Sequence, residues 1–202
     1  ELATEYEIPV IEDNPYGELR FEGEILPSLK CFDPKNLVIM LGTFSKILAP
    51  GMRLGWVIAR PDVLQKYNIA KQGADLQCSS MAQREVNMFM EMYDIEEHIK
   101  KIIKVYGARK NLMLETIKKE FPSSVKCTNP VGGLFAWATF PEEIDASVLL
   151  KKALEQKVAF VPGEPFYPNG GNANHCRLNY SCMSEDKIVD GITRLGKALK
   201  TM

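Results

Sequence analysis

The segment GTFSKILAPGMRLGW, at residues 42–56, carries the strongest chemical signal in the chain. It follows the apolar run 37–41, and such a run without alternation is typical of a strand buried on both faces of a sheet. Lys46 therefore stands directly after a predicted strand, between hydroxyl residues and glycines. Partial burial at a strand end lowers the pKa of a lysine, and its neutral amine then forms a Schiff base with an aldehyde.

Three side chains around Lys46 have the chemistry to bind a phosphate. Arg53 offers a charged fork of donors, and the hydroxyls of Thr43 and Ser45 add further donors. An aldehyde bound by a lysine beside a bound phosphate describes pyridoxal 5'-phosphate (PLP). The spacing matches neither a P-loop nor a G-x-S-x-G nucleophile elbow. On this segment alone, the alternative that Lys46 is a loop lysine and Arg53 a surface arginine stays open.

A second motif, D-x-x-Y, follows the apolar run 8–11 and contains Asp13 and Tyr16. A carboxylate that faces a pyridine nitrogen keeps that nitrogen protonated, so the ring acts as an electron sink. A phenol near the cofactor's phenolate oxygen tunes the bond to the lysine. Taken by itself, the same motif is also typical of an Asx-type turn with a packed tyrosine.

The order of these motifs resembles the PLP-dependent aminotransferases of fold type I, class I/II. The series consists of a strand with D-x-x-Y, a strand with (S/T)-x-S-K, and then P-G-x-R-x-G-W. Residues 42–56 are most similar to the branch of 2-aminoadipate, kynurenine and aromatic aminotransferases. That branch includes the aminotransferase-like effector domains of some bacterial transcription regulators. The resemblance spans the chain, through VAFVPGEPFY at 158–167 and RLNYS at 177–181.

The resemblance implies a role for each matching position in the cofactor site. Lys46 forms the Schiff base and carries the proton between the substrate Cα and the cofactor C4′. Asp13 pairs with the pyridine nitrogen, and Tyr16 hydrogen-bonds the phenolate oxygen. The phosphate is expected to be bound by Thr43, Ser45 and Arg53.

Residues of the last third match the family's substrate site. The arginine of R-L-N-[FY]-S binds the substrate α-carboxylate by a two-pronged contact, so Arg177 is expected to have this role. In isolation, Arg177 would be interpreted as a surface-strand arginine in a salt bridge. His175 is expected to be a neighbour of the site, and Gly132-Gly133 a structural element where glycine permits a close backbone approach.

The resemblance also implies the architecture. Residues 1–105 are expected to form the later part of an α/β PLP-binding large domain, with a mostly parallel sheet and helices. Residues 106–202 are expected to form a small C-terminal α+β domain. Chains of the family are about twice this length and their amino-terminal half completes the cofactor site, so this chain is expected to be the carboxy-terminal portion. A homodimer is expected for the full-length enzyme.

Periodicity predicts the elements between the motifs. Ser79-Ser80 is expected to cap a helix through about Tyr93, and isoleucines at helical spacing predict a long helix over 95–121, which either bends at Gly107 or bridges two domains. Beyond the long helix, we expect strands at 134–139, 158–161 and 176–181 and helices at 145–156 and 184–199. The apolar stripe of the first of these two helices is predicted to be Val148, Leu149 and Leu154.

Composition excludes several classes of protein. The chain has 202 residues, with 25 lysines and arginines against 26 aspartates and glutamates, and this balance argues against a nucleic-acid partner. The longest apolar run, 134–138, is far too short to span a membrane. Five cysteines without a C-x-x-C pair predict free thiols in the cytoplasm and no metal site.

The function expected from all this is that of a PLP-dependent aminotransferase, which transfers an amino group between an amino acid and a 2-oxo acid. Two alternatives keep Lys46 but differ in outcome. One is the PLP-binding effector domain of a transcription regulator, and the other is a PLP-dependent carbon-sulfur lyase. The amino-acid substrate does not follow from this chain.

Overall fold

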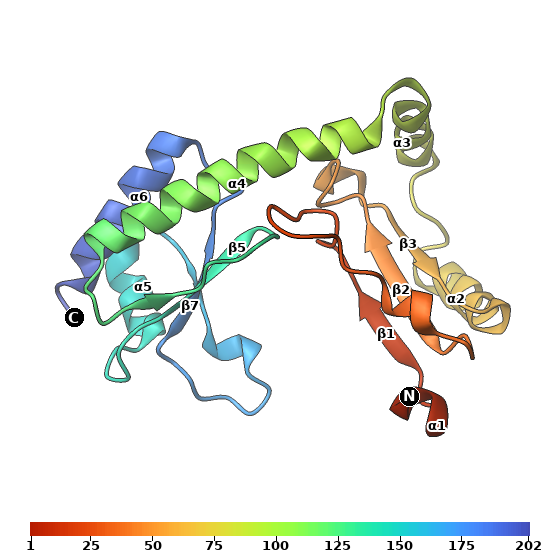
Figure 1. Ribbon diagram of the computed structural model, residues 1–202, viewed down its shortest axis with the longest axis horizontal. Helices are drawn as coiled ribbons and strands as arrows, with labels where there is room; N and C mark the ends of the chain where they lie inside the picture. The colour runs from red at the N-terminus through yellow and green to blue at the C-terminus, as the bar shows by residue number, and fades with distance from the viewer. The chain divides into compact units, whose positions relative to one another are not determined.

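The computed structural model describes residues 1–202, which form two compact units, residues 1–102 and 103–202 (Figure 1). Both units combine helices with a sheet, as the expected α/β class requires. The predicted domain boundary lay at 105/106. That the first unit is part of a large domain and the second a small domain stays a prediction.

The first unit contains a three-stranded sheet together with helices and short 3-10 turns. Its elements are α1 (Leu2–Glu5), β1 (Val10–Asp13), η1 (Leu29–Phe32), β2 (Val38–Thr43), η2 (Pro50–Met52), β3 (Gly55–Ile58), α2 (Pro61–Ala74), α3 (Ser80–Met92) and the start of α4 (Ile95–Glu120).

The sheet of the first unit has the order β1-β2-β3, and its strands lie side by side in Figure 1. β1 and β2 are parallel, with Asp13 opposite Leu41. β2 and β3 are antiparallel, with Thr43 opposite Gly55. β3 is therefore an antiparallel strand in a sheet that was expected to be mostly parallel. The connection 44–54 contains no crossover helix, and parallel neighbours need a crossover of roughly a dozen residues or more.

The helices of the middle segment follow their sequence signals. The Ser79 hydroxyl accepts a hydrogen bond from the Ala82 amide at 3.3 Å, which confirms the predicted cap of α3. α4 runs from Ile95 to Glu120 as one continuous helical segment, and Gly107 lies inside it. α2 was not predicted, although Pro61 at its first position is a common start signal.

The second unit contains a four-stranded sheet with the order β4-β5-β7-β6, whose neighbouring strands are all antiparallel. It begins within α4, and its further elements are β4 (Lys126–Cys127), β5 (Phe135–Thr139), α5 (Ala146–Glu155), β6 (Val161–Pro162), η3 (Glu164–Phe166), β7 (His175–Asn179) and α6 (Glu185–Leu199). β6 is shorter than the predicted strand 158–161 and begins at its last residue.

Alternation along β5 and β7 divides the second sheet into two faces. One face is buried and carries Ala136, Ala138, Cys176 and Leu178. The opposite face carries half-buried side chains, among them Arg177. Buried residues of α5 and α6 complete the core.

The buried stripe of α5 differs from the prediction. It consists of Ala146, Leu149 and Ala153, whereas Val148 and Leu154 are 45% and 54% exposed. Small alanines allow a helix to approach its neighbours closely, and a pattern based on large apolar residues underestimates them.

All five cysteines are free, as predicted. Burial raises the pKa of the Cys127 thiol to about 11 and holds the pKa of the Cys176 thiol above its usual range as well. Both therefore stay neutral near pH 7 and behave as small apolar side chains. None of the helices combines the length and the apolar composition needed to cross a membrane.

Trp56 packs against Gly42, its partner in the β2–β3 register. A Cβ atom built on Gly42 would lie 2.1 Å from Cζ2 of the indole, so the ring occupies the space that a side chain would take. Glycine is required here by a close approach and not by backbone conformation.

We therefore expect Gly42→Ala to lower the free energy of unfolding by about 1–3 kcal/mol, because the Trp56 ring has to move. Chemical unfolding of the natural full-length protein measures this change. Gly51→Ala is the matched control, because a Cβ at Gly51 meets no atom within 4 Å. Equal stability of the two variants would contradict this explanation.

Candidate active site

Parallel pairing brings two of the predicted motifs to one edge of the first sheet. Asp13 ends β1 and Thr43 ends β2, and the strands run in the same direction. The Asn14 amide extends the ladder by donating to the Leu41 carbonyl at 3.2 Å. The D-x-x-Y loop and the turn that carries Lys46 therefore leave the sheet at the same edge.

Lys46 lies on a tight turn that is anchored by apolar neighbours. The Leu48 and Ala49 amides both donate to the Phe44 carbonyl, at 2.9 and 3.0 Å. Phe44 and Leu48 pack against a buried cluster of Leu54, Ala82 and Val86. The turn is thus packed against α3. This packing fixes the backbone position of the half-buried Lys46.

The Lys46 ammonium lies 5.9 Å from the centre of the Tyr16 ring. A cation over an aromatic face at this distance is attracted by the ring's quadrupole. Lys46 forms no ion pair with a carboxylate. Asp13, at the same sheet edge, is exposed, and its carboxylate accepts no hydrogen bond from the chain. The amine of Lys46 therefore lies near the phenol of Tyr16, at the sheet edge where Asp13 ends β1.

The two predicted phosphate-binding hydroxyls differ in their partners. The Thr43 hydroxyl donates to the Leu54 carbonyl at 3.0 Å and accepts from the Ser45 amide at 3.1 Å. It therefore closes the 43–54 loop, and its proton is already engaged. The Ser45 hydroxyl makes no hydrogen bond within the chain, so it is the hydroxyl that is available to a ligand.

Arg53 adopts the left-handed conformation, with φ at 53°, at the end of η2. A residue other than glycine in this region is strained by of order 1 kcal/mol or more, and such strain is concentrated at functional positions. One terminal nitrogen donates to the Pro50 carbonyl at 3.1 Å. The exposed guanidinium keeps its other donors, and Arg53 also lines a cavity of about 540 Å³ at the start of α3.

Arg177 lies in the second unit, on β7, opposite Trp137 of β5. It projects from the face that is not covered by the helical core. Its guanidinium carbon lies 4.1 Å from the centre of the Phe135 ring and 4.9 Å from that of Phe166. Its Nε is buried without a hydrogen-bond partner, and no carboxylate pairs with it. Within this chain, Arg177 therefore forms no salt bridge of the kind that the surface-strand alternative predicts.

The residues that follow Arg177 in the R-L-N-Y-S motif have structural roles. The Asn179 side chain accepts hydrogen bonds from the Ser181 and Cys182 amides, at 3.0 and 3.2 Å, and so shapes the turn after β7. The buried Tyr180 hydroxyl donates to the Gly132 carbonyl at 3.1 Å. Burial raises the pKa of this phenol. The close backbone approach expected at Gly132-Gly133 is not found at Gly133, where an added Cβ would meet no atom within 4 Å. Glycine at this position suits a φ of 78° instead.

His175 contributes to the aromatic surroundings of Arg177. Its ring lies 6.0 Å from that of Trp137 and 5.6 Å from that of Tyr167. Its Nδ1 is 3.0 Å from the Asn172 carbonyl oxygen. His175 therefore packs beside the arginine and forms no ion pair or hydrogen bond with an acidic side chain.

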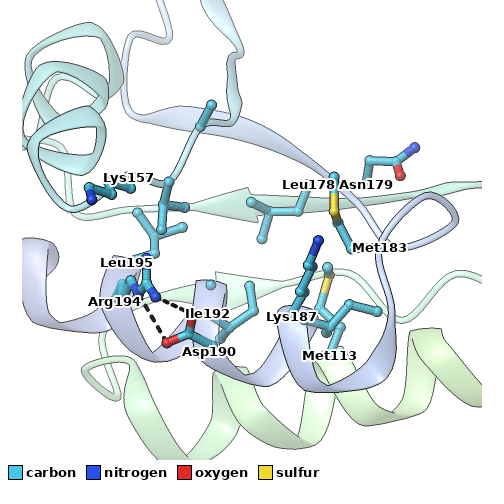
Figure 2. A pocket seen from close by; sticks show the side chains of 14 residues that line it. Met113, Lys157, Leu178, Asn179, Met183, Lys187, Asp190, Ile192, Arg194 and Leu195 are labelled. Atoms are coloured by element: carbon cyan, nitrogen blue, oxygen red, sulfur yellow. Dashed lines mark hydrogen bonds and ion pairs between the residues drawn. The ribbon is translucent and has the colours of Figure 1, made fainter.

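A separate cavity of about 450 Å³ opens in the second unit, and Figure 2 shows its walls. Leu178, Ile188 and Leu195 form apolar walls, and the Asp190–Arg194 ion pair lies at one end. Leu178 points to the side of the sheet opposite Arg177. None of the sequence-predicted site residues lines this cavity, which is therefore distinct from the candidate site.

A sequence profile described as aminotransferase class I and II matches residues 1–195. The chain belongs to this family. The observed strand order, with D-x-x-Y and T-F-S-K at one sheet edge, has the fold type I arrangement expected for such aminotransferases.

Individual family members are highly similar to the chain. The aromatic-amino-acid aminotransferase 1 of Thermococcus litoralis is 45% identical over 200 residues, which are 99% of this chain and 48% of that protein. The 2-aminoadipate transaminase of Thermus thermophilus is 40% identical over 205 residues, 99% of this chain and 51% of that protein. The chain thus spans about half the length of the curated relatives it matches.

Solved structures of aminotransferases share the fold. The crystal structure of the α-aminoadipate aminotransferase of Thermus thermophilus, complexed with N-(5'-phosphopyridoxyl)-L-leucine, superposes with a TM-score of 0.95. It is 39% identical and covers 99% of this chain and 52% of its own chain. The phosphopyridoxyl-leucine ligand was observed in the Thermus thermophilus enzyme.

Sequence reasoning missed the aromatic residues that surround Arg177. Phe135 and Trp137 alternate along β5, and Phe166 belongs to η3. A period of two along β5 was a visible signal that both aromatics share one face. The contact from Phe166 had no local signal, because it joins a loop to a strand.

We expect Thr43→Val to lower the free energy of unfolding by about 1 kcal/mol, because the Ser45 amide loses its acceptor and the Leu54 carbonyl loses one donor. Thr43→Ser keeps the hydroxyl and should retain most of the stability. Denaturant unfolding of the natural full-length protein tests the pair. Identical stability of the two variants would show that the hydroxyl does not close the loop.

Proposed function

We propose that this chain provides the Schiff-base lysine and the substrate carboxylate site of a PLP-dependent aminotransferase. The observation that carries the proposal is the convergence of unpaired Lys46 with Tyr16, at the sheet edge where Asp13 lies. Membership of the aminotransferase family, and relatives at 45% and 40% identity that are named as aminotransferases, favour this function over a regulator domain or a lyase.

The donor set at the sheet edge fits PLP. The cofactor has an aldehyde, a phosphate, a pyridine nitrogen and a phenolate oxygen, and the chain offers a group of suitable chemistry for each. Lys46 would bind the aldehyde carbon, Asp13 the pyridine nitrogen, and Tyr16 the phenolate oxygen. The phosphate would be bound by Ser45 and Arg53, and by Thr43 once its hydroxyl turns from the Leu54 carbonyl.

Bound PLP supplies an electron sink that stabilises negative charge at the substrate Cα. Asp13 would keep the pyridine nitrogen protonated, because a carboxylate beside that nitrogen favours its charged form. The Lys46 amine would hold the aldehyde carbon and, as a free amine, would serve as the base that moves the proton at the substrate Cα. The fixed turn between Phe44 and Ala49 limits how far this amine moves.

Arg177 would bind the α-carboxylate of the amino acid and of the 2-oxo acid. A guanidinium presents two parallel donors that match the two oxygens of a carboxylate. Arg177 makes no internal ion pair, so its charge is available to the substrate. A substrate with a carboxylate on Cα is the shared requirement of both half-reactions.

We further propose that the full-length enzyme is a cytoplasmic homodimer. Met81, Met88 and Met92 share one face of α3 and are 66%, 56% and 66% exposed, which is typical of a surface that packs against another chain. Five free thiols suit a reducing compartment.

The natural full-length protein, loaded with PLP, should convert 2-oxoglutarate to glutamate when a suitable amino acid is supplied. A panel of aromatic and acidic amino acids identifies the donor. Release of pyruvate and ammonia from a cysteine conjugate, without glutamate, would instead indicate a lyase. A protein that retains PLP and turns over no amino acid would support the regulator alternative.

Lys46→Ala should abolish both transamination and the absorbance band of the lysine-bound cofactor, because no other amine can replace it at the aldehyde. Lys66→Ala, at an exposed position of α2, is the matched control and should keep both. An unchanged spectrum in Lys46→Ala would exclude Lys46 as the Schiff-base residue.

Arg177→Ala should raise the KM for the amino acid at least tenfold, because a charged two-pronged contact is lost, while PLP stays bound. Steady-state kinetics and the cofactor absorbance measure the two effects separately. Loss of PLP together with substrate affinity would point to a folding role for Arg177.

A further inference from the structure

The guanidinium of Arg177 lies over two aromatic rings that come from different elements. Phe135 belongs to β5, beside β7 in the sheet, and lies 4.1 Å from the guanidinium carbon. Phe166 belongs to η3 and lies 4.9 Å from the same atom. A guanidinium is attracted to an aromatic face, and two such faces restrict its position more than one does.

These rings replace the carboxylate that usually orients a half-buried arginine. Nε of Arg177 is buried and donates to no acceptor, and no acidic side chain pairs with the guanidinium. An aromatic face attracts the cation without accepting its N–H groups. The terminal donors of Arg177 therefore stay free while the group itself is held in place.

Phe166 is in turn held by a specific packing arrangement. The Phe166 amide donates to the Gly163 carbonyl at 3.0 Å, and the Gly163 amide donates to the His175 carbonyl at 2.7 Å. The Trp137 ring meets Phe166 edge to face, with centres 5.5 Å apart and planes at 86°. η3 is thus tied to β7 and β5 at the level of the arginine.

Gly163 makes this arrangement possible. A Cβ atom there would lie 2.6 Å from Cβ of His175 and 2.9 Å from the Trp137 ring. No real side chain tolerates such contacts with a strand residue and a packed indole. The loop therefore comes close enough to place Phe166 over Arg177 only because residue 163 is glycine.

We propose that Phe166 is a positioning residue, which holds the Arg177 guanidinium for the carboxylate of the substrate. The inference rests on the proposed function and goes beyond it by assigning a role to η3. Phe166 is 48% exposed, so its ring contributes little to the core. The ring instead fixes the position of the Arg177 guanidinium. A substitution of Phe166 is therefore expected to weaken binding of the substrate carboxylate.

The test compares Phe166→Leu with Phe166→Tyr in the natural full-length enzyme loaded with PLP. Leucine fills space but has no aromatic face, whereas tyrosine retains the face. We expect Phe166→Leu to raise the KM for the amino acid and the 2-oxo acid by about fivefold to thirtyfold, with kcat changed less than twofold. Phe166→Tyr should restore the original KM.

A substrate without the carboxylate separates positioning from a general structural effect. A primary amine that carries the same side chain should react equally with the original enzyme and with Phe166→Leu. The Kd of a 2-methyl amino acid, which has no Cα proton to lose, should rise as much as the KM. Tyr167→Leu removes an aromatic ring of the same loop that contacts Trp137 and His175, and it should leave the KM within twofold.

The outcomes distinguish this inference from the proposed function. If Arg177→Ala raises the KM and Phe166→Leu does not, the positioning role is wrong and the carboxylate site stands. If neither variant changes the KM, the assignment of Arg177 itself is wrong. Equal losses for the amine and the amino acid in Phe166→Leu would likewise overturn the positioning role.

Discussion

Parallel pairing between β1 and β2 is the constraint on which the candidate cofactor site depends. Two parallel strands end at the same edge of their sheet, so side chains that follow them in the sequence meet in space. The pairing brings the D-x-x-Y loop to the turn of Lys46, although about thirty residues separate them along the chain. The packing of Phe44 and Leu48 against α3 and the hydrogen bonds to the Leu54 carbonyl then fix the turn at that edge. A slip in the pairing would separate the amine from the phenol without altering either residue.

The two sets of candidate functional residues are held in place by different interactions. At the first sheet edge, backbone hydrogen bonds and a small apolar cluster hold a turn whose lysine remains unpaired. Around Arg177, aromatic rings hold the polar group directly. In both cases the charged group is supported by partners that do not neutralise it. This is the electrostatic condition for binding a ligand with complementary charges, because a charge that is already paired has little left to offer.

The sequence was sufficient to predict those features that one local pattern defines. The strand end at Asp13, the turn that holds Lys46 after β2, and the α3 cap at Ser79 belong to this group, whereas the chemical roles of Asp13 and Lys46 stay predictions. Contacts between distant segments were not predictable in this way. The antiparallel direction of β3, the seat of Trp56 on Gly42, and the placement of Phe166 over Arg177 each depend on how two elements meet. The burial of the alanines of α5 was not predicted for a related reason. Whether an alanine is buried depends on which element packs against it.

The backbone and the side chain of residue 53 favour different amino acids. Glycine would adopt the left-handed backbone conformation of residue 53 without strain, but it would provide no guanidinium. Glycine at residue 53 would favour stability, whereas the proposed binding of the cofactor phosphate requires the arginine. The strained backbone at Arg53 is therefore the energetic cost of placing a guanidinium at this position.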